Sequence, residues 1–89
     1  MKLYSMHDRK MNVYLTPFPA RGDVDAIRNV KTSSVHPDMK NTPVGEHPED
    51  FDLVYLGEFD DESGDITRAG IPMIIGNVAQ IIAPSTVPS

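Results

Sequence analysis

The chain has 89 residues and a mass of 9.8 kDa, contains no cysteine, and carries thirteen acidic against eight basic side chains, a formal net charge of −5. A chain of this length buries only about 60–65% of its unfolded surface, which disfavours a deep, enclosed active site. The lack of cysteine excludes disulfides and thiolate metal sites, and no apolar run reaches the length of a membrane span or resembles a signal peptide. We therefore expect one α+β domain over residues 1–83, without membrane association, and a disordered tail over 84–89.

The first forty residues predict a β-hairpin followed by a helix. Two β-favourable runs, residues 2–7 and 12–18, flank a polar segment. Proline in the second run lacks an amide hydrogen, so this strand should end near Phe18. From Asp23 onward, apolar residues recur at helical spacing for about three turns, which predicts one buried stripe made of Val24, Ala26, Ile27 and Val30.

The middle of the chain predicts a loop and then a second hairpin. Prolines, serines and a glycine are so dense between residues 32 and 48 that we expect a long loop without a regular element. Residues 51–59 place apolar side chains on both faces, as in a central strand. The acidic segment 60–65 contains glycine and predicts a turn into a fourth strand near residues 66–68. The predicted fold class is α+β: two β-hairpins form a small antiparallel sheet that packs against one main helix.

The apolar segment 71–83 is compatible with two structures. Asn77 and Gln80 have the spacing of a reciprocal helix cap, which predicts a short helix over residues 78–83. The dipeptide Gly76-Asn77 also fits the turn of a hairpin between isoleucine-rich strands. Since a thin monomeric core leaves part of this segment uncovered, the sequence predicts a homodimer interface here.

Charge is distributed unevenly along the chain. Residues 1–40 carry seven bases and four acids, a net of +3, whereas residues 41–89 carry nine acids and one base, Arg68, a net of −8. We expect folding to separate the basic first hairpin and helix from the acidic second hairpin. Only the basic side could then tolerate a nucleic-acid backbone.

No motif predicts catalysis or a bound cofactor. The histidines His7, His36 and His47 lack the spacing of paired ligands on one helix, so a zinc site would need ligands from separate segments. The acidic turn lacks the ligand spacing of a calcium-binding loop, and no glycine-rich phosphate-binding motif occurs. We expect no enzymatic activity, no cofactor and no metal ion.

Three segments carry a family resemblance: MKLYSMHDRK at residues 1–10, DAIR at 25–28, and PEDFDLVYLGEFD at 48–60. In this order they resemble the small nonstructural protein of gokushoviruses, which are microviruses with a circular single-stranded DNA genome. The resemblance runs from residue 1 to about 68, and the loop at 33–45 and the isoleucine-rich tail have no counterpart in it. It implies a phage-encoded accessory protein of the host bacterial cytoplasm, without fixed catalytic residues, that takes part in single-stranded genome synthesis.

Two functions follow as expectations. In the first, the protein binds single-stranded DNA and assists genome synthesis or handoff to packaging, since basic and aromatic side chains together build such binding surfaces. The candidate DNA contacts are Lys2, Tyr4, Arg9, Lys10, Tyr14, Arg28 and Lys31. In the second, an acidic adaptor docks on the phage replication protein or a host factor. Its candidate contacts are Asp60, Asp61, Glu62, Ile74, Ile75, Ile81 and Ile82.

Overall fold

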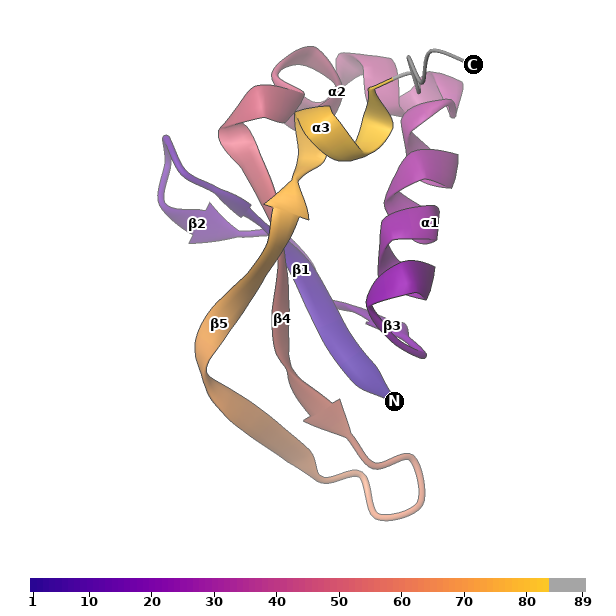
Figure 1. Ribbon diagram of the computed structural model, residues 1–89, viewed down its shortest axis with the longest axis vertical. Helices are drawn as coiled ribbons and strands as arrows, with labels where there is room; N and C mark the ends of the chain where they lie inside the picture. The colour runs from indigo at the N-terminus through magenta and orange to yellow at the C-terminus, as the bar shows by residue number, and fades with distance from the viewer. Residues whose placement is uncertain (84–89) are drawn as a thin grey trace, which may run out of the picture.

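A computed structural model of the protein describes residues 1–83, apart from the side chain of Met39, and shows an antiparallel sheet with helices along one side and one end (Figure 1). The predicted tail 84–89 lies outside the described residues. The strands are β1 (Lys2–Asp8), β2 (Val13–Tyr14), β3 (Phe18–Ala20), β4 (Phe51–Phe59) and β5 (Ile66–Asn77). The helices are α1 (Asp23–Ser34), α2 (Pro43–Glu46) and α3 (Val78–Ile82), with 3₁₀ turns η1 (Pro37–Asn41) and η2 (Pro48–Asp50). The predicted α+β class is confirmed.

The sheet has the order β2-β1-β4-β5, and β3 pairs with β1 as well. Each of β2 and β3 pairs with a different end of β1, so the predicted strand at 12–18 is divided into two short pieces around Pro17. The expected end near Phe18 is wrong, because β3 continues to Ala20. Pro19 is accommodated there since an edge strand leaves one row of amide groups without a sheet partner.

The second hairpin, with β4 as a central strand between β1 and β5, is confirmed. β5 is longer than predicted, because it continues past residue 68 to Asn77. The rival hairpin through Gly76-Asn77 is wrong, and the short C-terminal helix is confirmed as α3. Its cap differs in detail: the Asn77 side-chain oxygen accepts a hydrogen bond from the backbone N–H of Ala79 rather than that of Gln80.

The proline-rich segment is more regular than expected. Prolines stand at the first positions of η1, α2 and η2, where a helical turn needs no amide hydrogen from them. Thr42 caps α2 by accepting a hydrogen bond from Gly45 N–H at 3.1 Å. The prediction of a loop without regular elements is therefore wrong. Proline interrupts the interior of a helix, but it is well suited to the first turn of a short one.

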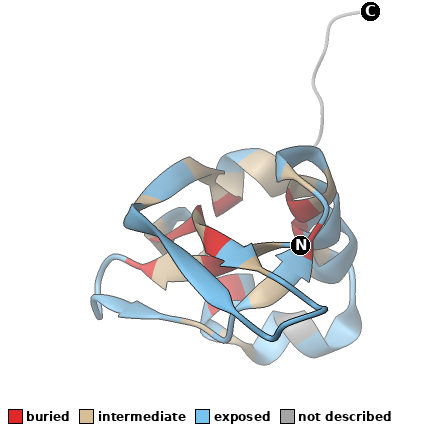
Figure 2. Ribbon diagram, turned by 90° about the horizontal axis from the view of Figure 1, so that it is seen from below, coloured by how far each residue is buried: buried red, intermediate tan, exposed pale blue. Residues whose placement is uncertain are grey.

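The hydrophobic core lies between the helices and one face of the sheet (Figure 2). Its buried side chains come from every layer: Tyr4, Ala20, Ala26, Val30, Val44, Phe51, Leu53 and Val78. Ala26 and Val30 confirm the inner stripe of α1, and Ile27 packs at its margin. Val24 contradicts the stripe and is 71% exposed, because at about 100° per residue it lies about 160° round the helix from Ala26.

An irregularity bends the β4–β5 hairpin where it leaves the core. Tyr55 pairs with Met73 and Gly57 pairs with Arg68, so residues 69–72 of β5 face Leu56 alone. Gly70 has a positive φ of 90° within this bulge, a conformation that favours glycine. Beyond the bulge, the ribbon formed by residues 57–68 projects from the body of the protein (Figure 1).

Candidate functional site

The tip of the projecting ribbon is an ordered acidic turn, residues 60–65. The side chain of Asp60 accepts hydrogen bonds from the backbone N–H groups of Glu62 at 2.9 Å and Ser63 at 3.4 Å. The backbone closes the turn through Asp60 N–H to the Asp65 carbonyl and Gly64 N–H to the Asp60 carbonyl. The hydrogen bond from Glu62, followed by that from Ser63, lowers the pKa of the Asp60 carboxyl, so Asp60 stays ionised.

A hollow of about 280 Å³ lies at the base of this turn. Four carboxylates take part in its lining, which comprises Met1, Glu58, Phe59, Asp60, Asp61, Asp65 and Thr67. The Met1 ammonium group donates a hydrogen bond to the Phe59 carbonyl at 2.7 Å. Exposed carboxylates around a concave surface fit a lysine or arginine side chain in size and charge.

The expected separation of basic and acidic sides is wrong for the first hairpin. Arg9 Nε lies 3.5 Å from Asp52, and Lys10 Nζ lies 3.7 Å from Asp50. Lys2 pairs in register with Glu58 and places its ammonium 5.7 Å from the centre of the Tyr55 ring. These cations meet acids of the second half because β1 pairs along its whole length with β4.

The candidate DNA contacts do not form one surface. Lys2 begins β1 and Arg9 follows its last residue, so the two lie about 23 Å apart at 3.3 Å per residue. Arg28 and Lys31 are exposed on α1, and Tyr14 is half-exposed on β2, where its ring packs 4.4 Å from that of His7.

Tyr4 cannot contact a base, and its predicted stacking role is wrong. The residue is fully buried, with its ring 5.5 Å from that of Tyr55 and 6.1 Å from that of Phe18. Its hydroxyl donates a hydrogen bond of 2.6 Å to Asp23 at the start of α1. Tyr4 therefore joins the sheet to the helix.

This buried hydroxyl should make stability fall at alkaline pH. Burial, and next the hydrogen bond to Asp23, raise the pKa of Tyr4 well above its ordinary value of 10.0. The unfolded chain ionises Tyr4 above about pH 10 while the folded chain keeps it neutral, so its stabilisation is present below that pH and is lost as pH rises toward the folded pKa. We expect the free energy of unfolding, measured in urea between about pH 8 and 11, to decrease accordingly.

The Tyr4→Phe variant isolates this effect. It should lose about 1–2 kcal/mol at pH 8, because Asp23 loses a hydrogen-bond donor. Its stability should then decline less than that of the parent chain above pH 10. Parallel declines of the two proteins would show that another group, such as Tyr55, causes the alkaline dependence.

Of the four isoleucines predicted to contact another protein, one is exposed. Ile75, Ile81 and Ile82 are partly buried against the core, because α3 folds back over the sheet, and they leave little apolar surface for another protein. Ile74 is 65% exposed. Ile71 and Met73, within the predicted interface segment 71–83, are also exposed along β5, and so is Ile66, which lies outside that segment.

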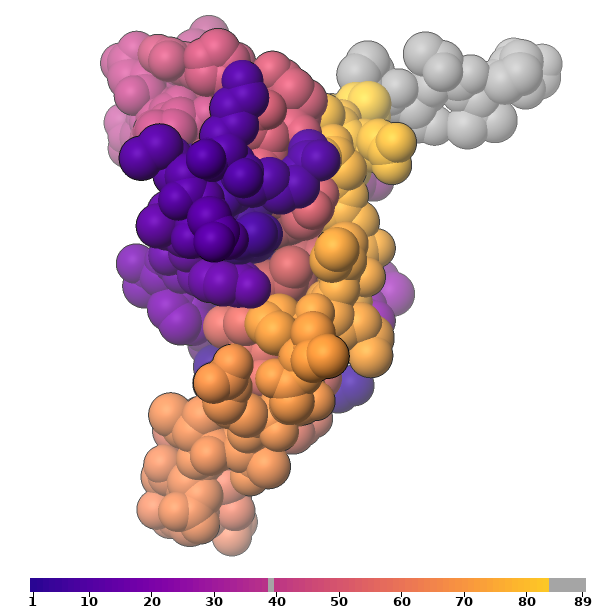
Figure 3. Space-filling view, turned by 90° about the vertical axis from the view of Figure 1, so that its left-hand side faces the viewer, coloured from indigo at the N-terminus to yellow at the C-terminus, as the bar shows by residue number. Residues whose placement is uncertain are grey.

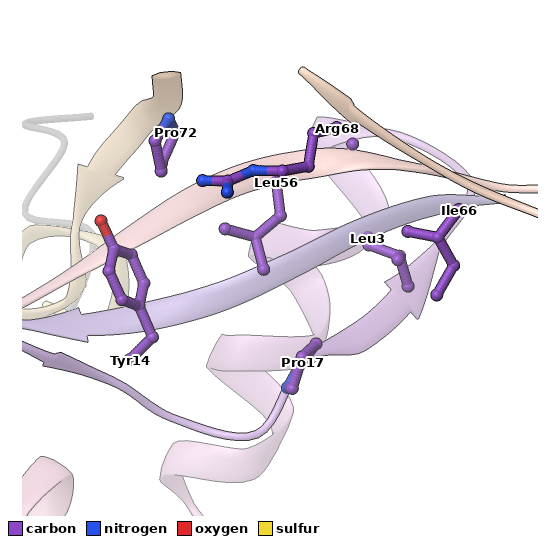
Figure 4. Close-up of a pocket in the computed structure, with 8 residues that line it drawn as sticks. Leu3, Tyr14, Pro17, Leu56, Ile66, Arg68 and Pro72 are labelled. Carbon is purple, nitrogen blue, oxygen red and sulfur yellow. The ribbon is translucent and has the colours of Figure 1, made fainter. Parts of the chain in front are cut away.

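The sheet face opposite the helices carries an apolar hollow of about 420 Å³. Leu3 and Leu56 belong to its floor, since side chains alternate along a strand and their neighbours Tyr4 and Tyr55 point to the core. In Figure 3, N-terminal residues in indigo and β5 in orange lie on either side of β4. Figure 4 shows the lining, which comprises Leu3, Tyr14, Pro17, Leu56, Gly57, Ile66, Arg68 and Pro72.

Within residues 1–83, one group of side chains could hold a metal ion. Donor atoms of His47, Glu49 and Asp50 lie within 4.8 Å of one another, so the ligands come from one segment rather than from separate ones. His47 and Glu49 are exposed, and Asp50 already pairs with the Lys10 ammonium. Because exposed donors with a competing lysine bind metals weakly, we assign no metal to them.

The fold and these surfaces can be compared with known proteins. A family model described as the phage ORF5 protein matches residues 1–81. The chain belongs to the phage ORF5 protein family. It is 39% identical over 79 residues to Protein ORF5 of Chlamydia phage 1, an alignment that covers 84% of this chain and 81% of that protein. No solved structure matches the fold.

The phage ORF5 match covers every element described above, including the ribbon, except the last residue of α3. The resemblance to a small microvirus protein is thereby confirmed at the level of a phage accessory protein. None of the helices within residues 1–83 has the length and apolar character needed to cross a bilayer.

Proposed function

We propose that this phage ORF5 protein is a non-catalytic adaptor in the host bacterial cytoplasm that docks its acidic ribbon on a basic surface of another protein. The phage replication protein and a host factor remain the candidate partners. The acid-lined hollow at the ribbon tip carries this proposal. Its carboxylates are exposed, and hydrogen bonds within the turn hold Asp60 in place before any partner arrives, which lowers the entropy cost of binding.

The pairing of charges on the first hairpin supports the same proposal. Arg9 and Lys10 already have carboxylate partners, so a phosphate would have to displace Asp52 or Asp50. The acidic turn is neutralised less: within residues 1–83 none of its carboxylates lies within 4 Å of a lysine, arginine or histidine nitrogen. The Met1 ammonium group lines the same hollow and acts on Asp60, one positive charge against four carboxylates. Complementary charge at an exposed tip steers association with a basic partner.

The test reverses charge on the turn without breaking it. Asp60 must stay, since its side chain organises the turn, so the variant is Asp61→Lys with Glu62→Lys. The matched control is Asp38→Lys with Glu46→Lys, which changes net charge equally at the opposite end of the molecule. In host cells producing the phage proteins, we expect the parent chain and the control to co-purify with the same basic protein. The amount of this protein recovered with the ribbon variant should be at least tenfold lower.

Equal recovery with the ribbon variant and the control would overturn the adaptor proposal. An acidic partner captured by all three chains would overturn it too, because attraction to the turn would then play no part. Circular dichroism of the variants checks that the sheet is intact.

A second function, binding of single-stranded DNA, is favoured by the exposed outer face of α1. Arg28 and Lys31 lie one turn apart there, and no carboxylate among residues 1–83 lies within 4 Å of either cationic group. The same variants distinguish this function, since a DNA-binding protein should hold an oligonucleotide more tightly after the ribbon loses its acids. Two phosphate contacts would give a salt dependence of about −1.4 in log K against log salt.

A further inference from the structure

The apolar hollow on the open sheet face is a recess with a floor but no cover. Gly57 lies between Leu3 and Arg68 in the register of β1, β4 and β5, and it contributes no side chain that would fill the space. Leu56 and Ile66 add apolar surface around it. The volume of about 420 Å³ lies within the range of ligand-binding pockets, which are mostly apolar with a few polar groups that orient the ligand.

The lining of this hollow contains one cation and no carboxylate. Arg68 is the single basic residue of the acidic second half of the chain, and no carboxylate within residues 1–83 lies within 4 Å of it. Its side chain extends toward Tyr14 across the hollow (Figure 4). Glu58 of β4 lies on the opposite face, because it accepts a hydrogen bond of 3.0 Å from the hydroxyl of Tyr55, a residue that packs against the core. The hollow therefore offers a guanidinium group that lacks an anion.

The open shape of the hollow suits one residue of a polypeptide better than a free small molecule. Pockets for small molecules enclose most of the surface of the ligand, whereas here Ile66 is 66% and Tyr14 49% exposed. The apolar surface also continues beyond the hollow. Ile74 is 65% exposed and stands two residues after Pro72 on β5, so it lies on the same face. A polypeptide can insert one side chain and lay its other residues along this surface.

We propose that the hollow binds the C-terminal residue of another protein, a large apolar residue whose α-carboxylate pairs with Arg68. Arginine binds a carboxylate through two parallel hydrogen bonds. Because Arg68 and the apolar floor belong to one hollow, the anion and the apolar group of the ligand must also lie close together. A C-terminal residue carries both on one Cα atom. An internal apolar residue depends on the carboxylate of a neighbour, and in an extended chain the adjacent side chain points to the opposite side.

This site is separate from the acidic tip of the ribbon. The two hollows share no lining residue, and they select ligands of opposite charge. The inference therefore goes beyond the adaptor function and does not depend on it.

Titration of the full chain with a short peptide, followed by the chemical shifts of backbone amides, tests the proposal. The probe is acetyl-glycyl-seryl-glycyl-phenylalanine with a free terminal carboxylate. We expect it to bind with a Kd of about 1 mM or lower and to shift the amides of Leu56, Gly57 and Arg68. The same peptide with a terminal amide should bind at least tenfold more weakly, and so should the acid peptide that ends in glycine. Both comparisons use the parent chain, so they do not depend on the folding of a variant.

Replacing Arg68 by glutamine tests which group receives the carboxylate. Arg68→Gln should lower the affinity for the acid peptide at least tenfold and remove the difference between the acid and amide peptides. Arg28→Gln is the matched control, because it removes the same charge from the exposed face of α1. It should leave the affinity within about twofold. The dispersion of the amide spectrum shows whether each variant is folded.

Absence of binding at about 5 mM of the acid peptide would overturn the proposal. Equal affinities for the acid and amide peptides would overturn it as well, and so would an acid preference that persists in the Arg68 variant. Decanoate is the probe for a free amphiphile. If it bound at least tenfold more tightly than the acid peptide and shifted the same amides, the hollow would take a small carboxylate instead of a chain terminus.

Discussion

Replacing Gly57 by alanine is expected to reduce the free energy of unfolding by about 2–3 kcal/mol, a large part of the total for a domain of this size. Gly57 is buried in β4 at the start of the bulge and has a φ of 157°. A Cβ atom there would overlap the backbone carbonyl oxygen of Thr67 and lie 3.1 Å from Arg68 Cα. Because these contacts are with backbone, the whole ribbon would have to move to relieve them.

Gly64→Ala is the matched control for this prediction. Gly64 also has a positive φ, 81°, but a Cβ atom at this position meets nothing within 4 Å. The free energy of unfolding of the Gly64→Ala variant should therefore fall by only about 1 kcal/mol, which is the conformational cost of a side chain at positive φ. Urea unfolding of the two variants separates backbone overlap from backbone conformation, and equal losses would show that β5 does not approach Gly57 closely. Amide chemical shifts of Thr67 and Arg68 should change in the Gly57 variant alone.

Local patterns in the sequence were sufficient to predict the individual elements. Apolar side chains on both faces of a short run identified β4, helical spacing identified α1, and Asn77 signalled the start of α3. Each of these signals acts over a few residues, as hydrogen bonds and side-chain spacing do. The error over residues 32–48 came from treating Pro37, Pro43 and Pro48 as terminators only, although proline also suits the first turn of a helix.

The distribution of charge could not be predicted in this way, because it depends on which strands become neighbours. Nothing local to Arg9 or Lys10 indicates that η2 and β4 will place Asp50 and Asp52 beside them. That arrangement follows from the register of β1 against β4, in which Asp8 lies opposite Phe51. The net charges of the two halves of the chain were therefore correct, but they did not predict where the charges lie on the surface of the folded protein.

Two signals in the sequence do identify what was missed. In β1, Tyr4 and Met6 alternate with Ser5 and His7, so a period of two places Tyr4 on the apolar, inward side. In β5, Ile71 stands between Gly70 and Pro72, residues that interrupt a regular strand and often mark a bulge. The first signal removes Tyr4 from the DNA candidates, and the second indicates the bulge in which Ile71 is exposed.

Replacing Asn77 by alanine should have an effect as large as that of Gly57→Ala, about 3 kcal/mol, because one side chain joins four elements. Its amide group donates hydrogen bonds to the carbonyl oxygens of Glu49 at 3.0 Å and Phe51 at 3.2 Å, and to the Asp52 carboxylate at 3.2 Å. Its oxygen accepts the Ala79 N–H at 3.0 Å and so caps α3. The variant loses all of these bonds, and urea unfolding measures the cost.

Serine and aspartate at the same position divide the effect into its parts. Asn77→Ser keeps a cap acceptor without the amide donors and should recover about 1 kcal/mol of the alanine loss. Asn77→Asp also keeps the acceptor but places a second carboxylate beside Asp52, so it should be less stable than the serine variant at pH 7 and approach it when both acids are protonated. α3 has only five residues and cannot persist without its docking contacts, so backbone amides 79–83 should exchange faster in the alanine variant. A loss below about 0.5 kcal/mol with unchanged exchange would show that Asn77 does not hold α3 against the sheet.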